Sequence, residues 1–508
     1  MAQRPVTINP TKPGGIAVGL VLALTLGTLG AVAWRADWGC GLGAADWAAV
    51  RFTVTQALVS AGLSCLLAIP VARALARRRF WGRSVLVTLL GAPFLLPVIV
   101  AVLGLLAVFG RNGILNDALG ALGLPEVSIY GFHGVVLAHV FFNLPLVTRL
   151  ILQGWLSIPA ERFRLAASLD APVGRLLERP MLRTVLPPAF LIVFLICLTS
   201  FAVALTLGGG PRATTVELAI YQALRFDFDL GRAAMLASIQ FGLCSIAAAL
   251  AWRMTAVDGF GAGLDRSVDR WDGSRWGDAV VIALVATFLL VPLIMVIVRG
   301  VPGLLELPAD ILRAALRSVT IAIISAALCI GLTLALALRG GRIVGLVGVL
   351  PLASSSLVVG TGLFLLVYPI VNPAKLALVV TALVNAVLAL PFALRSVAPA
   401  VDKITSDYAR LGAILDMSTW VWTTRVILPR LRRPLGFAAG LAAALSMGDL
   451  GVIALFAGDA QETLPLAMYR LMGAYRMDAA AGAALVLLVL SFALFWICDR
   501  GGRVDADL

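Results

Sequence analysis

The sequence predicts an all-α membrane protein that crosses the bilayer about twelve times, as two homologous halves of six transmembrane helices each. Three observations predict this fold class: an apolar composition, long stretches without charged residues, and an internal repeat. Of the 508 residues, 61% are hydrophobic and 13% are charged, against about 45–50% and roughly 25% in soluble domains. A chain this apolar cannot bury its hydrophobic surface inside a water-soluble globule, so lipid must be its solvent.

Stretches without charge locate the expected helices. Eleven stretches of at least 19 residues contain no charged residue, and about 20 residues are needed to cross the hydrocarbon core as a helix. A twelfth stretch is interrupted only by Asp449. In chain order, the expected spans are 13–34, 52–72, 84–110, 127–148, 184–211, 233–252, 279–298, 318–338, 343–374, 376–394, 434–458 and 479–498.

The basic residues predict the orientation. If both termini are cytoplasmic and the spans alternate, the inward segments contain 26 of the 40 lysines and arginines and the outward segments contain 12. The remaining two of the 40 basic residues are Arg149 and Arg395, which lie at the inner ends of two spans. This excess follows the positive-inside rule. The net charge of +13 is therefore a topological signal and a complement to anionic lipid, and we expect no nucleic-acid partner because no basic domain stands apart from the spans.

The residue patterns that metal sites, redox pairs and ATP-binding loops require do not occur in this sequence. The chain has two histidines and six cysteines, and none of them is spaced for a metal or a redox pair. No GxxxxGK[ST] phosphate-binding loop occurs. We therefore expect no metal site, no cofactor and no enzymatic activity in this chain, which cannot hydrolyse ATP by that chemistry alone.

An internal duplication divides the chain. Residues 164–170 (RLAASLD) match residues 410–416 (RLGAILD) at five of seven positions, at an offset of 246. Further matches occur at the same offset or at 248, among them Tyr221 with Tyr469. We expect a first half at 1–252, a polar cytoplasmic linker at 253–278 and a second half at 279–508. Each half has an even number of spans, so the halves are parallel repeats.

The matched segments lie in two long inward loops, 156–183 and 399–433, which we call the first and the second loop segment. Each carries leucines at a spacing of four, Leu165 with Leu169 and Leu411 with Leu415, so that both leucines share one helix face. Each is expected to end at a proline-rich re-entry into the membrane, at 186–188 or at 428–429. A connector that merely lies in the interface is one interpretation; a docking surface for a cytoplasmic partner is the one we favour, because these segments are the best-matched part of the duplication.

The loop segments resemble the cytoplasmic coupling loop of ATP-binding-cassette importer permeases, whose pattern is Glu-Ala-Ala-x3-Gly-x9-Ile-x-Leu-Pro. The second loop segment keeps the spacing, although Arg410 stands in the Glu place and Asp416 in the Gly place. The first loop segment departs at the same places and has a shorter later spacing. The residues that this resemblance assigns to ATPase coupling are Arg164, Leu165, Ala166, Leu169, Asp170, Arg410, Leu411, Gly412, Leu415, Asp416, Val426, Leu428 and Pro429.

A second resemblance covers nearly the whole chain. Residues 134–145, 205–224, 233–237 and 446–452 are similar to the fused two-half permeases of bacterial thiamine importers. The resemblance implies a multi-pass protein of the bacterial inner membrane that imports thiamine and its phosphate esters. It also implies two copies of an ATP-binding subunit with ATP and Mg²⁺ on the cytoplasmic side, and a periplasmic thiamine-binding protein. A fused permease for ferric iron or another small solute is the alternative, and an ion-coupled secondary transporter is a further one.

Polar residues inside the spans are the candidates for a substrate path. Asp449 is the acidic residue deep in a span, where a carboxylate costs about 2.5–3.5 kcal/mol on insertion scales; its charge suits the thiazolium cation of thiamine. His139, Asn143 and Asn385, which stands at the place equivalent to His139, and Ser355 could line the same path. The other interpretation is that these side chains hydrogen-bond neighbouring helices and hold the structure together.

Overall fold

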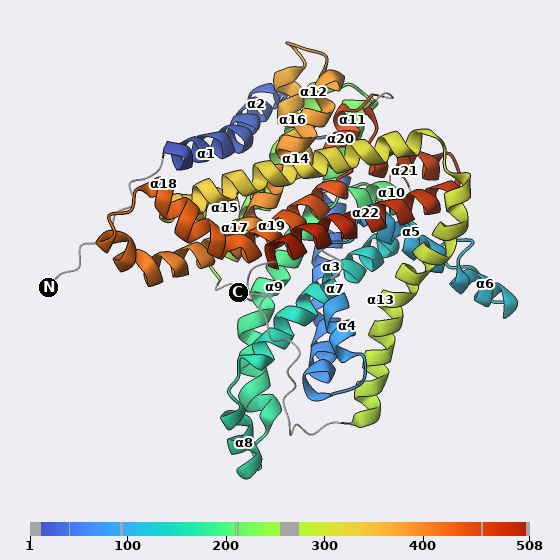
Figure 1. Cartoon of the computed structure of the whole chain (residues 1–508). Coiled ribbons are helices and arrows are strands. Elements are labelled where there is room, and N and C mark those ends of the chain that lie inside the picture. Colours follow the sequence, from blue (N-terminus) through green and yellow to red (C-terminus); the bar gives the residue numbers. More distant parts are fainter. Residues whose placement is uncertain are drawn as a thin grey trace. The chain divides into compact units, whose positions relative to one another are not determined.

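The computed structural model describes residues 12–39, 41–91, 95–208, 210, 213–254, 274–458 and 461–503 (Figure 1). Every regular element in these ranges is a helix. Eleven helices are long and apolar enough to cross a membrane, and the number is twelve when Ile343–Ala353 and Ser356–Val367, bent by 91°, count as one span. The predicted all-α fold with about twelve spans is confirmed. Most of the expected linker 253–278 lies outside the described residues.

The chain forms two compact units. Unit 1 comprises Met1–Gly39, Ile220–Phe241 and Leu307–Leu508, and unit 2 comprises Cys40–Ala219 and Gly242–Glu306. Two helices, α11 (Val216–Arg225) and α12 (Leu230–Trp252), cross the boundary between these ranges. The first span of the expected second half thus belongs to unit 2, and the first span of the expected first half belongs to unit 1.

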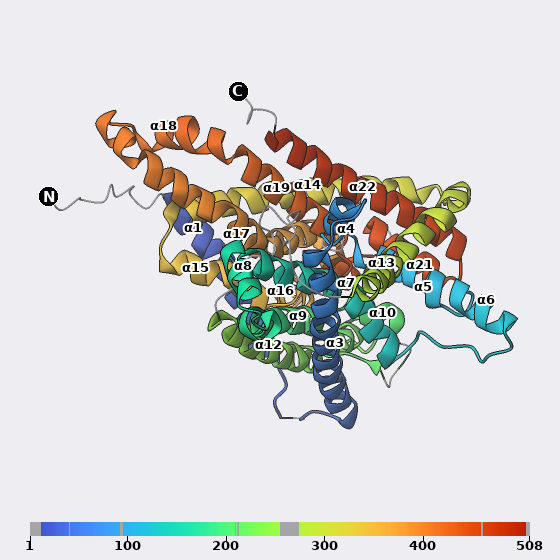
Figure 2. The same ribbon diagram turned by 90° about the horizontal axis from the view of Figure 1, so that it is seen from below.

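Unit 2 is built around α3, α7 and α9, which pack against one another (Figure 2). Its helices are α3 (Ala44–Arg77), α4 (Arg83–Leu89), α5 (Val98–Phe109), α6 (Ile114–Ala121), α7 (Phe132–Leu156), α8 (Ala160–Ser168), α9 (Arg179–Leu198), α10 (Ala202–Leu207) and α13 (Arg275–Gly303), with a π-helical turn, η3 (Gly174–Glu178), before α9.

Unit 1 is built in the same way around α14, α17 and α19, which also pack against one another, and α22 covers α19 (Figure 1). Its helices are α1 (Lys12–Leu22), α2 (Thr28–Arg35), α14 (Asp310–Arg339), α15 (Arg342–Val349), α16 (Ser356–Val367), α17 (Ala377–Ile414), α18 (Thr419–Val421), α19 (Leu428–Met447), α20 (Gly451–Phe456), α21 (Leu464–Gly473) and α22 (Met477–Arg503). Two π-helical turns, η1 (Ala23–Gly27) and η8 (Trp422–Ile427), join α1 to α2 and α18 to α19.

Four expected spans are interrupted rather than continuous. The third is interrupted between α4 and α5, and the fifth between α9 and α10. The ninth bends between α15 and α16, where Ser355 accepts a hydrogen bond from the Val358 N–H at 3.0 Å and so caps the new helix. The eleventh is interrupted between α19 and α20, where Asp449 lies. Charge-free length alone cannot reveal such breaks. Broken helices are tolerated at membrane depth where other groups satisfy the freed backbone.

The helices also extend past several expected limits. The fifth and eleventh spans begin earlier than predicted, with Arg183 inside α9 and Arg432 inside α19. Arginine is tolerated near a helix end because its long side chain reaches the polar interface while its stem stays in apolar surroundings. Using charges as boundaries therefore made these helices too short.

The first helix of each half crosses a glycine of the unit in which it packs. In unit 2, α13 packs on α3 and α5, and a Cβ on Gly104 of α5 would lie 2.6 Å from the carbonyl oxygen of Pro292. In unit 1, α2 packs on α16, and a Cβ on Gly362 would lie 2.5 Å from the carbonyl oxygen of Thr28. Both crossings thus require glycine, because any side chain there would enter the backbone of the crossing helix.

The N-terminal ends of these first helices are held differently. Asp278 of α13 pairs with two arginines at the end of α3: one carboxylate oxygen accepts from Arg78 Nε at 2.6 Å and the other lies 3.7 Å from Arg77. In unit 1 a glycine of α1 takes this place, since a Cβ on Gly14 would lie 2.8 Å from Cβ of Arg339 at the end of α14. The contact in unit 2 is thus an ion pair, and the contact in unit 1 is the close packing of a glycine against the side chain of Arg339.

Gly104→Ala should destabilise the protein, although alanine favours a helix by about 1 kcal/mol over glycine. The added methyl group meets backbone rather than a movable side chain, and overpacking of this kind costs about 1–3 kcal/mol. Thermal unfolding of the purified protein measures the change. The matched control is Gly62→Ala in α3, where a Cβ meets nothing within 4 Å; if both variants unfold at the same temperature as the parent, the close crossing at Gly104 is wrong.

Candidate functional site

The two loop segments share one helix ending. In the first, the N–H of Ala171 donates to the carbonyl of Ala166 at 2.8 Å and the N–H of Asp170 to that of Ala167 at 3.4 Å. In the second, Met417 and Asp416 repeat both bonds at 3.1 and 3.4 Å. This is a Schellman ending, which places the residue after the C-cap in the left-handed backbone region. Asp170 has φ 48° and Asp416 has φ 43°.

The left-handed geometry explains the Gly place of the coupling-loop pattern. Asp170 and Asp416 stand in that place, and glycine adopts positive φ without the steric penalty that a Cβ imposes. Aspartate is one of the few other residues that visit this region, because its short side chain can bond locally. The departure from glycine in the sequence therefore keeps the backbone turn and adds some strain to it.

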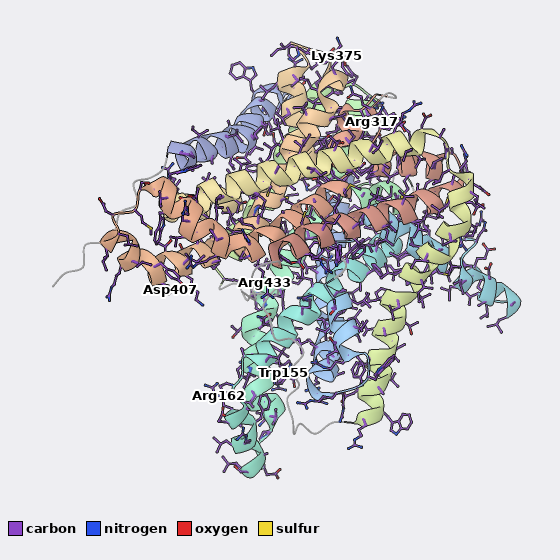
Figure 3. All side chains as sticks on the ribbon, in the orientation of Figure 1. Trp155, Arg162, Arg317, Lys375, Asp407 and Arg433 are labelled. Atoms are coloured by element: carbon purple, nitrogen blue, oxygen red, sulfur yellow. The ribbon has the colours of Figure 1, made fainter. Side chains whose placement is uncertain are left out.

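The leucines of both segments are exposed. Leu165 and Leu169 are 60% and 67% exposed, and Leu411 and Leu415 are 46% and 55% exposed. Arg162 of α8 also points away from the packed helices, whereas Trp155 of α7 is buried (Figure 3). These leucines lie beyond the charge-free stretches 127–148 and 376–394, and large apolar side chains exposed together in such segments are typical of a protein–protein contact.

Buried residues on the opposite faces hold the segments in place. In α8, Phe163 and Ala166 are buried, and the Phe163 ring lies 6.0 Å from that of Trp155. In the second segment Gly412 is covered by Trp422, since a Cβ on Gly412 would lie 2.7 Å from the indole ring. The guanidinium of Arg430 lies 4.3 Å above the Tyr408 ring, which joins the end of α17 to the start of α19.

The remaining assigned residues have different exposures. Arg164 and Arg410 are exposed, and Arg164 lies 4.0 Å from Glu161 in an exposed ion pair. Val426 is buried in η8, whereas Leu428 is half-buried and Pro429 is exposed at the start of α19. The side chains that face outward are therefore those of the two leucine pairs, the two arginines, Asp170, Asp416 and Pro429.

The expected re-entry of the first segment is wrong in position. Pro187 and Pro188 lie inside α9, and the proline at the start of that helix is Pro180, which matches Pro429 at the start of α19. Each segment also passes through a π-helical turn, η3 or η8, just before this proline. The sequence does contain a match for the start of this helix, because Pro180 and Pro429 are related by an offset of 249. The proline pair at 187–188 is more conspicuous and led to the wrong position.

The first segment has a separate short helix, whereas the second is the end of one long helix. The difference lies at Pro159, which corresponds to Thr405 at the offset of 246. A proline disfavours helical backbone at the residue before it, so α7 ends at Leu156 and α8 begins at Ala160. Thr405 imposes no such restriction, and α17 continues to Ile414.

The first polar cluster lies inside unit 2 and contains two of the predicted path residues. Ser60 Oγ lies 3.5 Å from His139 Nδ1, and the Asn143 side-chain amide donates to Cys197 Sγ at 3.5 Å. Gln56 donates to the carbonyl of Cys197 at 3.0 Å. The cluster therefore joins α3, α7 and α9.

The second polar cluster lies at the equivalent place in unit 1. The Asn385 amide donates to Ser446 Oγ at 3.1 Å, and Ser446 donates to Ser325 Oγ at 3.0 Å. The Asn385 side chain is also near the Asp449 carboxylate. This cluster joins α14, α17 and α19, as the first one joins α3, α7 and α9.

Asp449 differs from the other members because part of its bonding capacity is unused. Its Oδ1 accepts from the Gly451 N–H at 3.2 Å, whereas its buried Oδ2 has no hydrogen-bond partner in the described part of the chain. His139 Nε2 is likewise buried without such a partner. A buried carboxylate oxygen without a partner costs free energy, so Asp449 is the path candidate with the clearest capacity for a further ligand. Ser355, by contrast, is committed to the cap of α16.

A duplicated hydroxyl bond was not foreseen from the sequence. Thr53 Oγ1 of α3 accepts from the Val216 N–H at 2.9 Å, and Ser318 Oγ of α14 accepts from the Leu464 N–H at 2.8 Å. Each bond holds the start of a short helix, α11 or α21, against the second span of its half. The sequence marks the two helix starts by the matching residues Thr215 and Thr463. The hydroxyl groups that bond to these helix starts belong to residues about 150 positions earlier in the chain, and no local pattern identifies them.

Within the described residues, no group of three or more histidine, cysteine, aspartate or glutamate side chains is placed to hold a metal ion. Many hydroxyl groups within the described spans donate to the backbone carbonyl four residues earlier, as Thr148 does to Leu144 and Thr381 to Ala377.

No protein-family model matches the chain. Comparison with characterised proteins finds relatives along nearly its whole length. The thiamine transport system permease protein ThiP of Escherichia coli (strain K12) is 40% identical over 97% of this chain and 97% of its own length. ThiP of Brucella abortus (strain 2308) is 39% identical over 98% and 97%, and ThiP of Haemophilus influenzae is 34% identical over 88% and 87%.

Asp416→Gly should raise the stability of the protein by about 1 kcal/mol, because glycine removes the Cβ clash of the left-handed backbone. Asp416→Ala removes the same carboxylate but keeps the Cβ, so it should give no gain. The melting temperatures of the two purified variants, compared with the parent, measure the difference. An equal gain from both variants would assign the effect to the charge and not to the backbone.

Proposed function

The chain belongs to the permease family of bacterial thiamine transport systems, and from this membership we propose how its two units are used. Its function is that of a transmembrane permease for thiamine import. Identity of about 40% extends over both halves, so the relationship includes the loop segments and the polar clusters alike. This full-length match is the observation that carries the proposal.

We propose that ATP hydrolysis is supplied by a separate ATP-binding subunit, of which two copies dock on the two loop segments. What supports this is the duplication of one exposed leucine face on one rigid helix ending in both segments. A periplasmic thiamine-binding protein would deliver the substrate from the other side. Both termini would then be cytoplasmic, with the repeat dividing the chain at 1–252, 253–278 and 279–508.

We further propose that the unused oxygen of Asp449 faces the substrate path and favours the thiazolium cation. The second polar cluster fixes the neighbouring Asn385 by hydrogen bonds, so the carboxylate is positioned by the scaffold. The phosphate esters of thiamine carry negative charge beside the same cation and would gain less from Asp449. The other four candidates, His139, Asn143, Asn385 and Ser355, would act mainly as positioning residues.

Replacing Leu165 and Leu169 with Asp should release the ATPase from the first loop segment while the permease still inserts. The two leucines are exposed, so the change introduces charge into the contact without disturbing the buried residues Phe163 and Ala166. Co-purification of the ATPase and substrate-stimulated ATP hydrolysis measure the effect, and we expect a loss of at least about tenfold in each. Ala167→Asp adds a charge at an exposed position on another face of α8 and should be tolerated; a double variant that still binds ATPase and transports disproves the docking surface.

Asp449→Asn keeps the size of the side chain but removes its charge. If the carboxylate faces the path, uptake of labelled thiamine should fall several-fold more than uptake of thiamine diphosphate, while ATPase binding remains. The control is Asp478→Asn, an exposed carboxylate at the start of α22. Equal losses for both substrates, together with a lower melting temperature of the complex, would instead make Asp449 part of the scaffold.

A further inference from the structure

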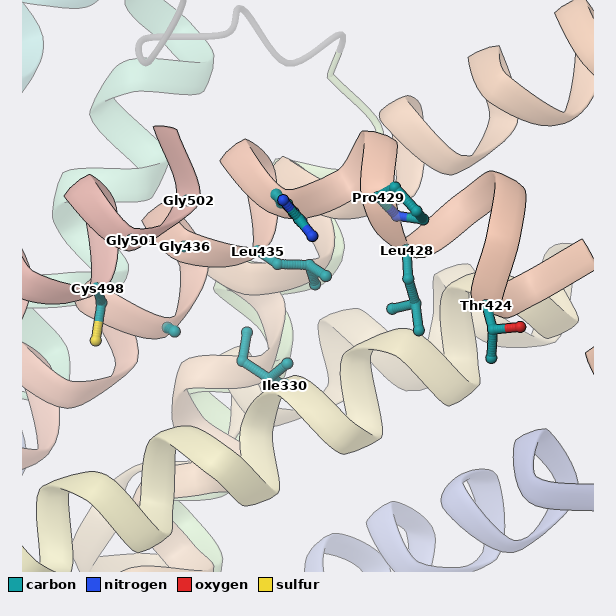
Figure 4. Close-up of a pocket in the computed structure, with 11 residues that line it drawn as sticks. Ile330, Thr424, Leu428, Pro429, Leu435, Gly436, Cys498, Gly501 and Gly502 are labelled. Atoms are coloured by element: carbon teal, nitrogen blue, oxygen red, sulfur yellow. The ribbon is translucent and has the colours of Figure 1, made fainter. Parts of the chain in front are cut away.

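A groove of about 730 Å³ lies between three helices of unit 1 (Figure 4). Its volume is within the range of about 300–1,000 Å³ that is typical of small-molecule sites. Ile330 of α14, Leu435 and Ala439 of α19 and Cys498 of α22 give it an apolar floor, and Arg432 of α19 adds a guanidinium. The groove thus combines an apolar surface with a fixed positive charge.

Glycines create the groove by bringing α19 and α22 close together. A Cβ on Gly436 would lie 2.6 Å from the carbonyl oxygen of Cys498, and a Cβ on Gly440 would lie 2.9 Å from that of Phe495. Gly436 and Gly440 form a GxxxG pattern, which allows close backbone approach between membrane helices. On α22, a Cβ on Gly502 would lie 3.1 Å from Cα of Gly436. The two helices are therefore in backbone contact at these glycines, and the groove lies beside this contact.

The surroundings of the groove are those of a membrane interface. Trp496 of α22 is 57% exposed, and the guanidinium of Arg500 lies 5.0 Å from the centre of its ring. Tryptophan with a neighbouring arginine is typical of the level of lipid headgroups. Large apolar side chains on the two flanking helices, Leu328 of α14 and Ile497 of α22, are also exposed, so the groove is bordered by surface suited to lipid chains.

The charges near the groove favour an anion. Residues 419–441 contain four arginines and no acidic residue, and residues 489–502 contain Arg500 and Asp499. A basic pocket between transmembrane helices at the membrane surface is the expected binding site of an anionic lipid headgroup. An apolar floor that continues from the charged end suits the acyl chain of the same molecule.

We propose that this groove binds an anionic phospholipid, with the phosphate at Arg432 and an acyl chain along Ile330, Leu435 and Ala439. Thr424, Leu428 and Pro429 of the second loop segment line the same groove. A bound lipid therefore contacts that segment and α22 at once. It joins the segment to the last span of the protein.

The test uses the complete permease–ATPase complex in nanodiscs of phosphatidylcholine, with or without phosphatidylglycerol. Cys498 lines the groove, so in a chain that keeps it as the sole cysteine its reaction with a maleimide reports occupancy. Phosphatidylglycerol should slow this reaction roughly fivefold or more, the effect expected of about one basic residue near an anionic surface. Arg432→Gln should abolish the slowing, whereas Arg433→Gln, which removes the same charge from an adjacent residue outside the groove lining, should retain it.

Native mass spectrometry of the unmodified chain provides a second readout that does not depend on cysteine replacement. The parent and Arg433→Gln should retain phosphatidylglycerol in preference to phosphatidylcholine, and Arg432→Gln should lose the preference. Equal labelling in both lipids, equal loss in both variants, or protection of Cys498 by glycerol phosphate alone would overturn the proposal. Protection that depends on the ATPase and not on the lipid would also overturn it, since a protein segment would then occupy the groove.

Discussion

Unpaired backbone polar groups cannot be left in hydrocarbon, and the main features of this protein follow from that constraint. At four interruptions or helix starts inside the units, a side chain accepts a hydrogen bond from one of the freed N–H groups. Ser355 caps α16, Asp449 bonds to Gly451 before α20, and the hydroxyls of Thr53 and Ser318 accept from the starts of α11 and α21. The polar residues of the spans are therefore first a condition of folding. A role in transport can be assigned only to a polar atom that has no hydrogen-bond partner once the protein is folded.

The two halves meet the same requirements with different residues. His139 and Asn385 occupy equivalent places, but His139 contacts Ser60 of α3 directly, whereas Asn385 donates to Ser446 of α19, which in turn donates to Ser325 of α14. The first helix of one half is held by the ion pairs of Asp278, and that of the other by the close packing of Gly14. A duplicated backbone thus conserves the position of a contact while its chemistry diverges. Equivalence in geometry is the better guide to function here than identity of residue type.

Composition and the offset of 246 were sufficient for the number of spans and for the two loop segments, because both depend on local runs of apolar or repeated residues. They were insufficient for the breaks at Ser355 and Asp449, which are set by capping and not by hydropathy. Nor could they identify Pro180, since a proline pair nearby offered a more conspicuous match. The partners of Thr53 and Gly104 lie more than 150 residues away. Such contacts require the packed structure.

The asymmetry of the second polar cluster bears on substrate choice. At the offset of 249 that relates α9 to α19 and α10 to α20, Asp449 corresponds to Ser200, a neutral and half-buried residue before α10. A permease made of two identical subunits would carry two carboxylates at this level, and two like charges in a low-dielectric region disfavour ionisation of both. Fusion of the halves removes that restriction, since one half can keep the carboxylate while the other carries a neutral serine. A single carboxylate matches the single cationic ring that we propose as its ligand, and this asymmetry is a physical reason for such a permease to be one chain.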